Sequence, residues 1–582
     1  MTTSYRTSVS NVLVIGTGGA GMRAAIAAHQ AGCEVTLIGK RLRKDAHTVL
    51  AAGGINAALA TVDIDDTWQW HYADTIRDGY FLNNSRMVEI MAQSAPNAVK
   101  ELAEWGCNFA RRDDGRLDQR FFGAHRYRRT CYAGDYTGRA ILYTLADRVN
   151  ELGIQIHDYQ YVSRLLVKDH QCFGALAFDI HTGERTVYLA DAIILAAGGH
   201  TRLWRRSSSR RDENTGDGYA LALQAGATLA DMELVQFHPT GMTHPEEMAG
   251  TLVTEAVRGE GGHLLNAAGE RFMARYDSER MELSTRDRVA LANYTEIIEG
   301  RAGEHGGVFL DISHREKDFI LTKLPRMYRQ FMESQMLDIS QKPMEVSPTA
   351  HYSMGGVVVD PETTATEVAG LYAAGEVTAG LHGANRLGGN SLVETVVFGR
   401  RAGEQAAAFS GAINVQMRDK AVIQAANDAL SSLIHDGGEM ARPLQRAVRN
   451  TMWEYCGVVR NQERLEAGLQ RLQELKEAAE RVDVRPSSEG WQDLATALDL
   501  QGALYAAEAT IRCALERRES RGAHQRYDYP EVDPAQVVNY TIRLNENGQQ
   551  VLGRSAVPGI PDELRSYVED DPQLLFKGRL LE

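Results

Sequence analysis

The segment near the N-terminus places a glycine-rich turn between an apolar strand pattern and a helix pattern, and this order limits the possible folds more than any other feature. Asn11-Val-Leu-Val-Ile15 is a β-branched apolar run, and Gly16-Thr-Gly-Gly-Ala-Gly21 follows it. Met22–Ala31 is helix-like, and Glu34–Ile38 has the composition of the next strand. This succession predicts a βαβ unit in which the helix N-terminus binds a pyrophosphate.

Each glycine of the turn has a specific physical purpose in such a unit. Gly16 makes the tight turn, Gly18 lets the backbone approach the phosphates, and Gly21 lets the helix pack closely on the strand. Gly39-Lys40 follows the second strand, where an acidic residue commonly holds a ribose. The segment therefore predicts a dinucleotide without choosing between FAD and NAD, and the alternative is a turn that is merely rich in glycine.

Charge and composition exclude several classes of protein. The 582 residues are enough for several domains. Asp and Glu outnumber Lys and Arg by 77 to 63, and the net charge of −14 argues against nucleic acid as a partner. A hydrophobic content of 43% with 24% charged residues is typical of a globular protein and not of a disordered one.

The six cysteines lie far apart and include no CxxC pair, so we expect no metal or iron–sulfur site in this chain. So few cysteines are typical of a protein from a reducing compartment, where disulfides are rare. The first ten residues lack the pattern of a signal peptide, and no apolar run approaches the roughly 20 residues that span a bilayer. We therefore expect any link to a membrane to come through a partner.

A second motif brings in a family resemblance. Asp45-Ala-His-Thr-Val-Leu-Ala-Ala-Gly-Gly54 resembles the flavin-attachment segment of the flavoprotein subunits of succinate dehydrogenase and fumarate reductase. In that family the histidine carries FAD covalently through the 8α-methyl group, and the matching residue is His47. Taken alone, His47 fits equally a surface histidine or a capping histidine at the start of a helix.

Further stretches match the same family in the same order, and the resemblance covers roughly residues 10 to 410. It implies an FAD-dependent oxidoreductase of the FAD-dependent oxidoreductase 2 family that interconverts succinate and fumarate by hydride transfer. The matching stretches are Phe237–Gly241, Thr254–Gly262, Glu282–Arg288, Ala350–Gly356, Gly375-Glu376 and Leu381–Leu392.

The resemblance assigns the substrate site residue by residue. The residues expected to hold the substrate carboxylates are Arg386, His238, Thr254 and His351. Arg386 is suited to this because a guanidinium binds a carboxylate in bidentate fashion. Taken singly, each also has a structural explanation, such as a loop histidine, a cap or an ion pair. The expected proton donor is Arg286, with Glu255 and Arg258 as a relay and His238 in the catalytic set.

The expected flavin site draws on both ends of the matching stretch. Lys40 is expected near the adenosine, Asp217 in a second flavin loop, and Glu376 at a ribose or ribityl hydroxyl. The full expected set is Gly16, Gly18, Ala20, Gly21, Lys40, His47, Thr48, Gly53, Gly54, Asp217, Glu376, Ser391 and Leu392.

These motifs imply an α/β fold with a discontinuous organisation. We expect a Rossmann-like FAD-binding domain over residues 1–242 and 352–415, with an inserted α+β capping domain over 243–351. A helical bundle domain is expected over 416–526, because Leu465, Leu469 and Leu472 form one apolar helix face. The small C-terminal region, 527–582, includes a strand-like alternation over 537–543.

Three functions remain open at this point. The first is a flavoprotein subunit that exchanges electrons with an iron–sulfur partner subunit; through a membrane anchor subunit, it would sit at the cytoplasmic side of a membrane. The second is a soluble L-aspartate oxidase or soluble fumarate reductase of the same fold; the presence of His47 argues against the oxidase. The third, a non-catalytic flavoprotein, predicts loss of the substrate residues, which are all present.

Overall fold

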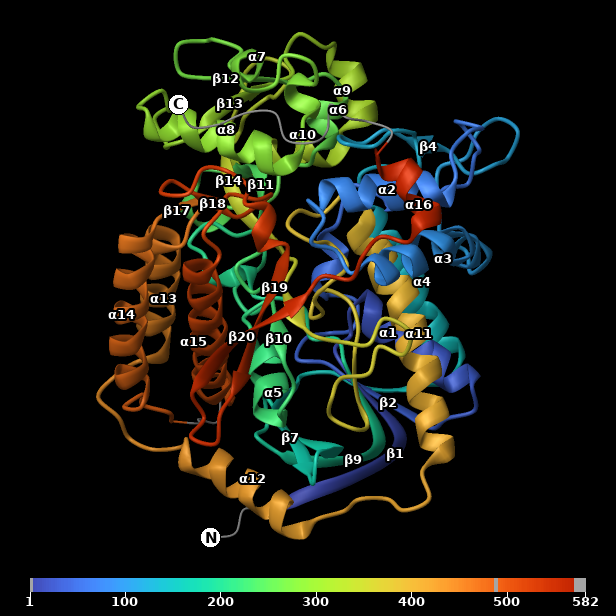
Figure 1. Ribbon diagram of the computed structural model, residues 1–582, viewed down its shortest axis with the longest axis vertical. Helices are drawn as coiled ribbons and strands as arrows, with labels where there is room; N and C mark the ends of the chain where they lie inside the picture. The colour runs from blue at the N-terminus through green and yellow to red at the C-terminus, as the bar shows by residue number, and fades with distance from the viewer. Residues whose placement is uncertain (1–3, 486–489, 570–582) are drawn as a thin grey trace.

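The computed structural model describes residues 4–485 and 490–569, and a mixed sheet forms its main layer (Figure 1). Strands follow the order β6-β2-β1-β9-β8-β7, and β16 pairs with the last residues of β9, beyond those that pair with β8. The strands β6, β2, β1, β9 and β16 are parallel to one another, while β7 and β8 form an antiparallel extension. Their bounds are β1 Tyr5–Ile15, β2 Val35–Ile38, β6 Gln155–His157, β7 Gln160–Lys168, β8 Gln171–Asp179, β9 Arg185–Leu195 and β16 Leu371–Ala373.

The predicted N-terminal βαβ unit is confirmed, with shifted boundaries. The strand β1 begins at Tyr5 because its polar first half pairs with β9 through the backbone, which hydrophobic patterning does not register. The helix α1 (Gly19–Gln30) begins inside the glycine turn, three residues before the predicted start. The turn and the first helical turn are therefore one structural feature.

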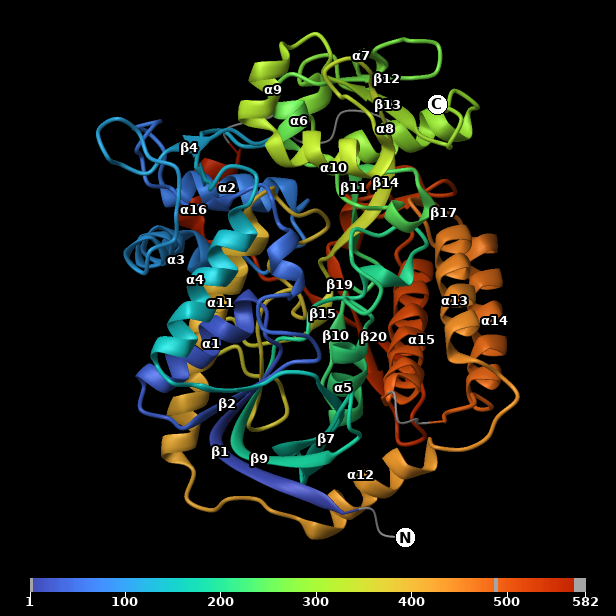
Figure 2. The ribbon, with the colours of Figure 1, turned by 180° about the vertical axis from the view of Figure 1, so that it is seen from behind.

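The helix α11 (Asn390–Ala412) lies along α1 over the sheet (Figure 2). Two glycines of α11 permit the close approach. A Cβ on Gly399 would lie 2.6 Å from the Ala20 carbonyl oxygen, and one on Gly403 would lie 2.2 Å from that of Ala24. The helices α3 and α4 pack beside this pair, and α2 packs on α3; their bounds are α2 Trp68–Asp78, α3 Ser85–Glu104 and α4 Thr137–Glu151.

A second hydrophobic core lies above the main sheet, in the part drawn in green and yellow at the top of Figure 1. It forms under the antiparallel sheet β11-β14-β13-β12, and its buried residues run from Met242 to Val346. The long strands β11 and β14 also reach down into the larger core through Phe237 and Ala350. The bounds are β11 Val235–Met242, β12 His263–Leu265, β13 Val308–Asp311, β14 Met344–Ser353, α6 Ala256–Gly259, α7 Met273–Tyr276, α8 Arg286–Ile298, α9 Lys317–Lys323 and α10 Pro325–Gln335.

The predicted helices of the C-terminal part are present, but they do not all form one bundle. The helices α13 (Ala441–Tyr455), α14 (Gln462–Ala479) and α15 (Gln492–Glu516) pack on one another, with Leu465 and Leu472 buried and Leu469 partly buried. The helix α12 (Lys420–Ser432) instead packs on β7 and β8. Over the described residues, no helix is both long enough and apolar enough to cross a membrane.

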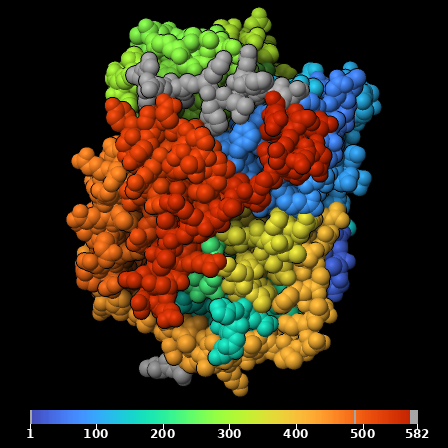
Figure 3. Space-filling model, in the orientation of Figure 1, coloured from blue at the N-terminus to red at the C-terminus, as the bar shows by residue number. Residues whose placement is uncertain are grey.

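The strand predicted over 537–543 is confirmed as β19 (Val538–Leu544) and pairs with β20 (Gln550–Ala556). This hairpin extends a sheet that includes β10 (Leu229–Ala230) and β15 (Gly356–Val357). It is therefore tied to the part of the chain that carries the flavin motifs. In Figure 3 the orange and red segments cover much of one face. The helix α16 (Asp562–Glu569) packs on α2, and residues 570–582 of the predicted C-terminal region lie outside the described residues.

The contact between α1 and α11 yields a prediction about stability. Gly403→Ala should destabilise the chain by about 1–3 kcal/mol, because the new methyl group overpacks the backbone of α1. The matched control is Gly411→Ala in the same helix, where a Cβ meets open space and should stabilise by up to about 1 kcal/mol. Thermal unfolding of both variants measures this. Equal effects would show that the helix contact does not limit stability.

Candidate active site

One continuous cavity runs from the turn after β1 to the strands β11 and β14. Of the thirteen residues predicted to bind flavin, all but Gly21 line it. Six predicted substrate or proton-transfer residues line it as well, whereas Arg258 lies behind its wall. The lining residues from the predicted set are Gly16, Gly18, Ala20, Lys40, His47, Thr48, Gly53, Gly54, Asp217, Glu376, Ser391 and Leu392 at the flavin end, and His238, Thr254, Glu255, Arg286, His351 and Arg386 at the other.

The glycine turn forms an open cradle for phosphate groups. Gly16 has a φ of +119°, and a Cβ there would lie 2.1 Å from the Ala196 carbonyl oxygen. Gly21 packs against the turn itself, since its Cβ would lie 1.8 Å from the Gly16 carbonyl oxygen, which explains why it does not face the cavity. Gly18, the residue before α1, offers no capping side chain, and the Thr48 hydroxyl accepts the first helical N–H, that of Gly19. Backbone N–H groups there face the cavity side of the turn, an arrangement that suits a pyrophosphate.

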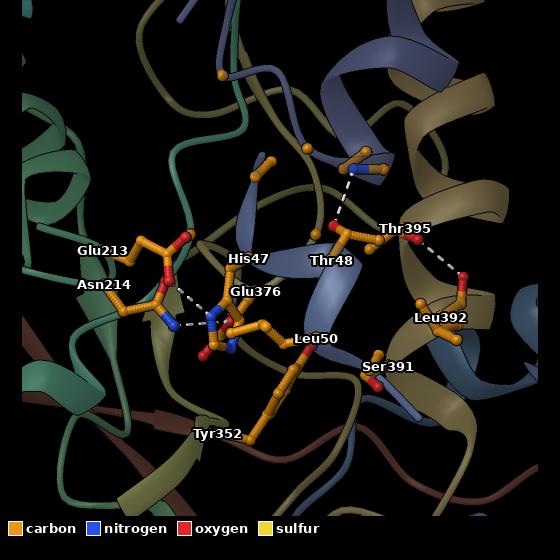
Figure 4. Close-up of a pocket in the computed structure, with 18 of the residues that line it drawn as sticks. His47, Thr48, Leu50, Glu213, Asn214, Tyr352, Glu376, Ser391, Leu392 and Thr395 are labelled. Carbon is orange, nitrogen blue, oxygen red and sulfur yellow. Dashed lines mark hydrogen bonds and ion pairs between the residues drawn. The ribbon is translucent and has the colours of Figure 1, made fainter. Parts of the chain in front are cut away.

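His47 begins the 3₁₀ helix η1 (His47–Leu50) and lies beside a buried carboxylate (Figure 4). Its Nδ1 is 3.1 Å from Oε2 of Glu213, and Arg210 pairs with the other oxygen of that carboxylate. Burial lowers the pKa of His47, but the hydrogen bond and charge of Glu213 outweigh it and raise the pKa overall. The pairing orients the imidazole and leaves Nε2 for another partner.

Thr48 and Glu376 lie on either side of His47 in the cavity (Figure 4). The Thr48 hydroxyl accepts the Gly19 N–H at 3.1 Å, which ties η1 to the start of α1. Glu376 Oε1 accepts the Ser353 N–H at 3.0 Å, and Oε2 accepts from the Asn214 amide at 3.4 Å. Desolvation is the main cause that raises the pKa of Glu376. A carboxylate placed this way is a good acceptor for sugar hydroxyl groups.

Lys40 and Asp217 form an ion pair instead of standing separately. The Lys40 ammonium is 3.0 Å from Asp217 and 3.0 Å from Asp499, which belongs to α15. Burial lowers the pKa of Lys40, and the two carboxylates raise it by more, so this lysine stays charged. The fit to FAD therefore rests on the phosphate cradle, the Glu376 carboxylate and the elongated cavity between them.

Arg386 presents an incompletely paired cation to the other end of the cavity. It is 3% exposed, its Nη1 donates to Ser391 Oγ at 3.0 Å, and its guanidinium lies 4.3 Å from the Tyr352 ring centroid. Among the described residues, its Nε has no hydrogen-bond partner. Burial and the nearby charge of Arg286 lower the pKa of Arg386 to about 10. A buried cation with a free donor favours an anionic ligand.

The two predicted histidines meet where β11 and β14 pair. The rings of His238 and His351 are 5.3 Å apart, centroid to centroid. Burial is the main cause that holds the pKa of each well below its usual range, so both imidazoles are neutral. His238 Nδ1 lies 3.2 Å from both the N–H and the carbonyl oxygen of Thr240, which hold the ring in place.

Thr254 is 2% exposed and lines the same end of the cavity. Its hydroxyl oxygen is 3.3 Å from the Ala256 N–H, which donates to it at the start of α6. The interpretation as a local cap and the interpretation as a cavity residue therefore both apply to Thr254.

Arg286, Glu255 and Arg258 form a buried chain of charges. Glu255 Oε2 is 2.8 Å from Nε and 2.8 Å from Nη2 of Arg286, and 3.8 Å from Nη2 of Arg258. Burial raises the pKa of Glu255, but the two arginines lower this pKa by a larger amount and keep the carboxylate ionised. For Arg258, burial is the main cause of a lowered pKa.

Sequence reasoning missed three polar residues that position this site. Glu213 orients His47, Asp499 pairs with Lys40, and Gln236 accepts from Arg286 Nη1 at 3.3 Å. Gln236 also donates to the Arg386 carbonyl oxygen at 2.9 Å, which links the two arginines. No local pattern signals these contacts, because the partners are 50 to 459 residues apart in the sequence.

The sequence matches two described families. Residues 11–392 match the FAD binding domain, and residues 445–557 match the fumarate reductase flavoprotein C-terminal domain. These two segments cover most of the chain, and the first includes every predicted residue that lines the cavity. FAD is therefore the cofactor of this chain.

Similar proteins match over nearly the full length. A fumarate reductase (CoM/CoB) subunit of Methanothermobacter marburgensis is 45% identical over 94% of this chain and 98% of its own. The succinate dehydrogenase flavoprotein subunit of Rickettsia bellii is 37% identical over 93% and 94%. The structure of Mycobacterium smegmatis Sdh1 in complex with UQ1 matches with a TM-score of 0.87 and 39% identity over 96% of both chains. This chain belongs to the family of FAD-binding flavoprotein subunits of succinate dehydrogenase and fumarate reductase.

Proposed function

We propose that this chain interconverts succinate and fumarate and exchanges the electrons with an iron–sulfur partner subunit. The observation that carries the proposal is the charge at the substrate end of the cavity. Arg386 and Arg286 both line that end; Glu255 pairs with Arg286, whereas Arg386 keeps an unpartnered Nε among the described residues. Two guanidinium groups at one end of the cavity favour a ligand that carries carboxylates.

Bound FAD supplies a hydride acceptor or donor at its N5 atom. Arg386 binds one substrate carboxylate, because its unpartnered Nε and its guanidinium edge offer donors to it. The neutral imidazoles of His238 and His351 add hydrogen bonds without adding charge, as does the Thr254 hydroxyl. Two fixed attachment points orient the reacting carbons toward the flavin end of the cavity.

Arg286 transfers a proton to or from the substrate carbon that neighbours the carbon exchanging the hydride. Because an arginine gives up a proton reluctantly, a second ionisable group must lie beside it to restore that proton. Glu255, ionised at rest, lies 2.8 Å away and relays to Arg286 a proton that it takes up from Arg258, 3.8 Å from the same carboxylate, so Arg286 is neutral only in passing. The same cation stabilises negative charge that develops on the substrate.

Residues 243–351 are proposed to act as a cap that excludes water from the site. Their separate hydrophobic core supports movement as a unit, and β11 and β14 connect that core to the flavin part. Exclusion of water strengthens the contacts between the arginines and the substrate.

Electrons need a route to or from a partner. The six cysteines are free and dispersed, and no described group of cysteines is placed to hold a cluster. We therefore assign the clusters to an iron–sulfur subunit, and we assign membrane association, on the cytoplasmic side, to an anchor subunit. The name of the Rickettsia bellii relative, a flavoprotein subunit, supports the presence of partner subunits. L-aspartate oxidation is the alternative, and the presence of His47 argues against it.

Anaerobic titration tests the proposed reaction. Succinate should bleach the visible flavin band of the purified holoprotein, and fumarate should restore it. L-aspartate is the matched comparison, because it differs from succinate by one amino group. Bleaching by L-aspartate alone would transfer the assignment to the oxidase. If neither acts, chemically reduced flavin that fumarate fails to reoxidise would contradict the proposal.

Arg286→Gln should lower kcat by about 10²–10⁴-fold, because it removes the proton donor. KM for fumarate should change less than kcat, since Arg386 remains. Arg288→Gln is the control: it stands two residues away on α8, does not line the cavity, and has Asp277 at 3.9 Å as its partner. Steady-state kinetics measures both variants. Turnover by Arg286→Gln near that of Arg288→Gln would remove Arg286 from the chemistry.

His47 is proposed to hold FAD covalently through the 8α-methyl carbon; forming that bond would release one proton from the imidazole and one from the methyl group, and the two electrons would go to the flavin ring. Yellow fluorescence should therefore stay with the chain after denaturing electrophoresis. It should be absent from His47→Ala and present in a control, His200→Ala, whose ring hydrogen-bonds Ser353 and Thr510 away from this cavity. Flavin that is released from the unmodified chain by denaturation would contradict the linkage.

A further inference from the structure

A cluster of two histidines and one glutamate lies beside the second hydrophobic core, away from the flavin cavity. His244 follows β11, His305 precedes β13, and Glu345 lies on β14. One ligand atom from each lies within 4.8 Å of the others. The imidazole rings of His244 and His305 are 3.8 Å apart, with planes tilted by 32°.

Neighbouring polar groups fix the orientation of two of the three side chains. The Thr243 hydroxyl donates to the Glu345 carbonyl oxygen at 3.2 Å, so its oxygen is left to accept the Nδ1–H of His244 at 3.0 Å. This tautomer leaves the lone pair of His244 on Nε2, which is the form that binds a metal. Glu345 Oε1 accepts the N–H groups of His305 and Gly307 at 2.8 and 3.0 Å, which holds the carboxylate in place.

We propose that His244, His305 and Glu345 form a site for a divalent first-row transition metal ion such as Zn²⁺. Two imidazole nitrogens and one carboxylate oxygen are a donor set that such ions prefer over Mg²⁺ or Ca²⁺. His305 is exposed and His244 is partly exposed, so an ion reaches the site from solvent. Water completes the coordination of a three-residue site.

The local charges permit a metal ion. Glu345 supplies one negative charge, and Glu304 lies near enough to His244 to influence its ionisation. The positive charge of Arg206 opposes the metal ion, because Arg206 donates to the carbonyl oxygens of His305 and Gly306 at 3.4 and 3.3 Å. Affinity is therefore weaker than for a site without this arginine.

The metal site shares its strands with the substrate site. His238 and His244 are six residues apart along β11 and its extension, and Glu345 and His351 are six residues apart on β14. At about 3.3 Å per residue, six residues place the two sites about 20 Å apart along the ribbon formed by β11 and β14. A metal ion bridging the ribbon and the loop before β13 would brace the strands on which both substrate histidines lie.

Metal titration of the intact holoprotein tests the proposal. After treatment with a chelator and removal of the chelator, the chain should bind Zn²⁺ with one ion per chain in competition with a chromophoric indicator. His305→Ala should weaken binding by more than about tenfold, and Thr243→Val by about tenfold, because it releases the His244 ring. Zn²⁺ should raise the melting temperature of the unchanged chain and not that of His305→Ala.

His314→Ala is the matched control. His314 is exposed and stacks on His263 at 4.6 Å in the same part of the fold. Among the described residues, it belongs to no group of three side chains placed to hold a metal ion. Zn²⁺ affinity should be unchanged in this variant. Equal affinity in His305→Ala and the unchanged chain, or binding that His314→Ala abolishes, would overturn the assignment. Because these readouts are metal affinity and melting temperature, the result is independent of the proposed reaction.

Discussion

The close packing of α1 on α11 is the contact that sets the arrangement of the site. It joins residues 19–30 to residues 390–412, so the phosphate cradle and the segment after Arg386 become neighbours. Gly399 and Gly403 permit the approach because larger residues would meet the backbone of α1. The parallel pairing of β1 with β9 completes the frame by bringing Ala196 against Gly16.

The antiparallel pair of β11 and β14 supplies the other half of the site. Its register places Phe237 opposite Ala350 and His238 opposite Thr349, which brings His238 and His351 within contact distance. The same strands contribute to both hydrophobic cores. Movement of the upper core relative to the flavin part therefore changes the position of both histidines together.

The buried charges at the proposed substrate end of the cavity come at a cost in stability. Arg386, Arg258 and Glu255 are each at most 5% exposed, and desolvation of such groups is unfavourable unless they are paired. Glu255 is satisfied by two arginines, whereas Arg386 keeps an unpartnered donor among the described residues. Under the proposed function, a carboxylate of the substrate would satisfy that donor, so binding would relieve the unpaired cation.

Elements with local signals could be predicted from the residues alone. The apolar run and the glycine spacing identified β1, the turn and α1, and the ordered motifs identified the family and eighteen of the residues that line the cavity. The partners of these residues emerge only in the folded chain. Glu213, Gln236 and Asp499 act through contacts across 50 to 459 residues, which no periodicity encodes. The same reason explains why α12 packs on the sheet, and why His244, His305 and Glu345 meet: burial and strand register are properties of the folded chain, not of neighbouring residues.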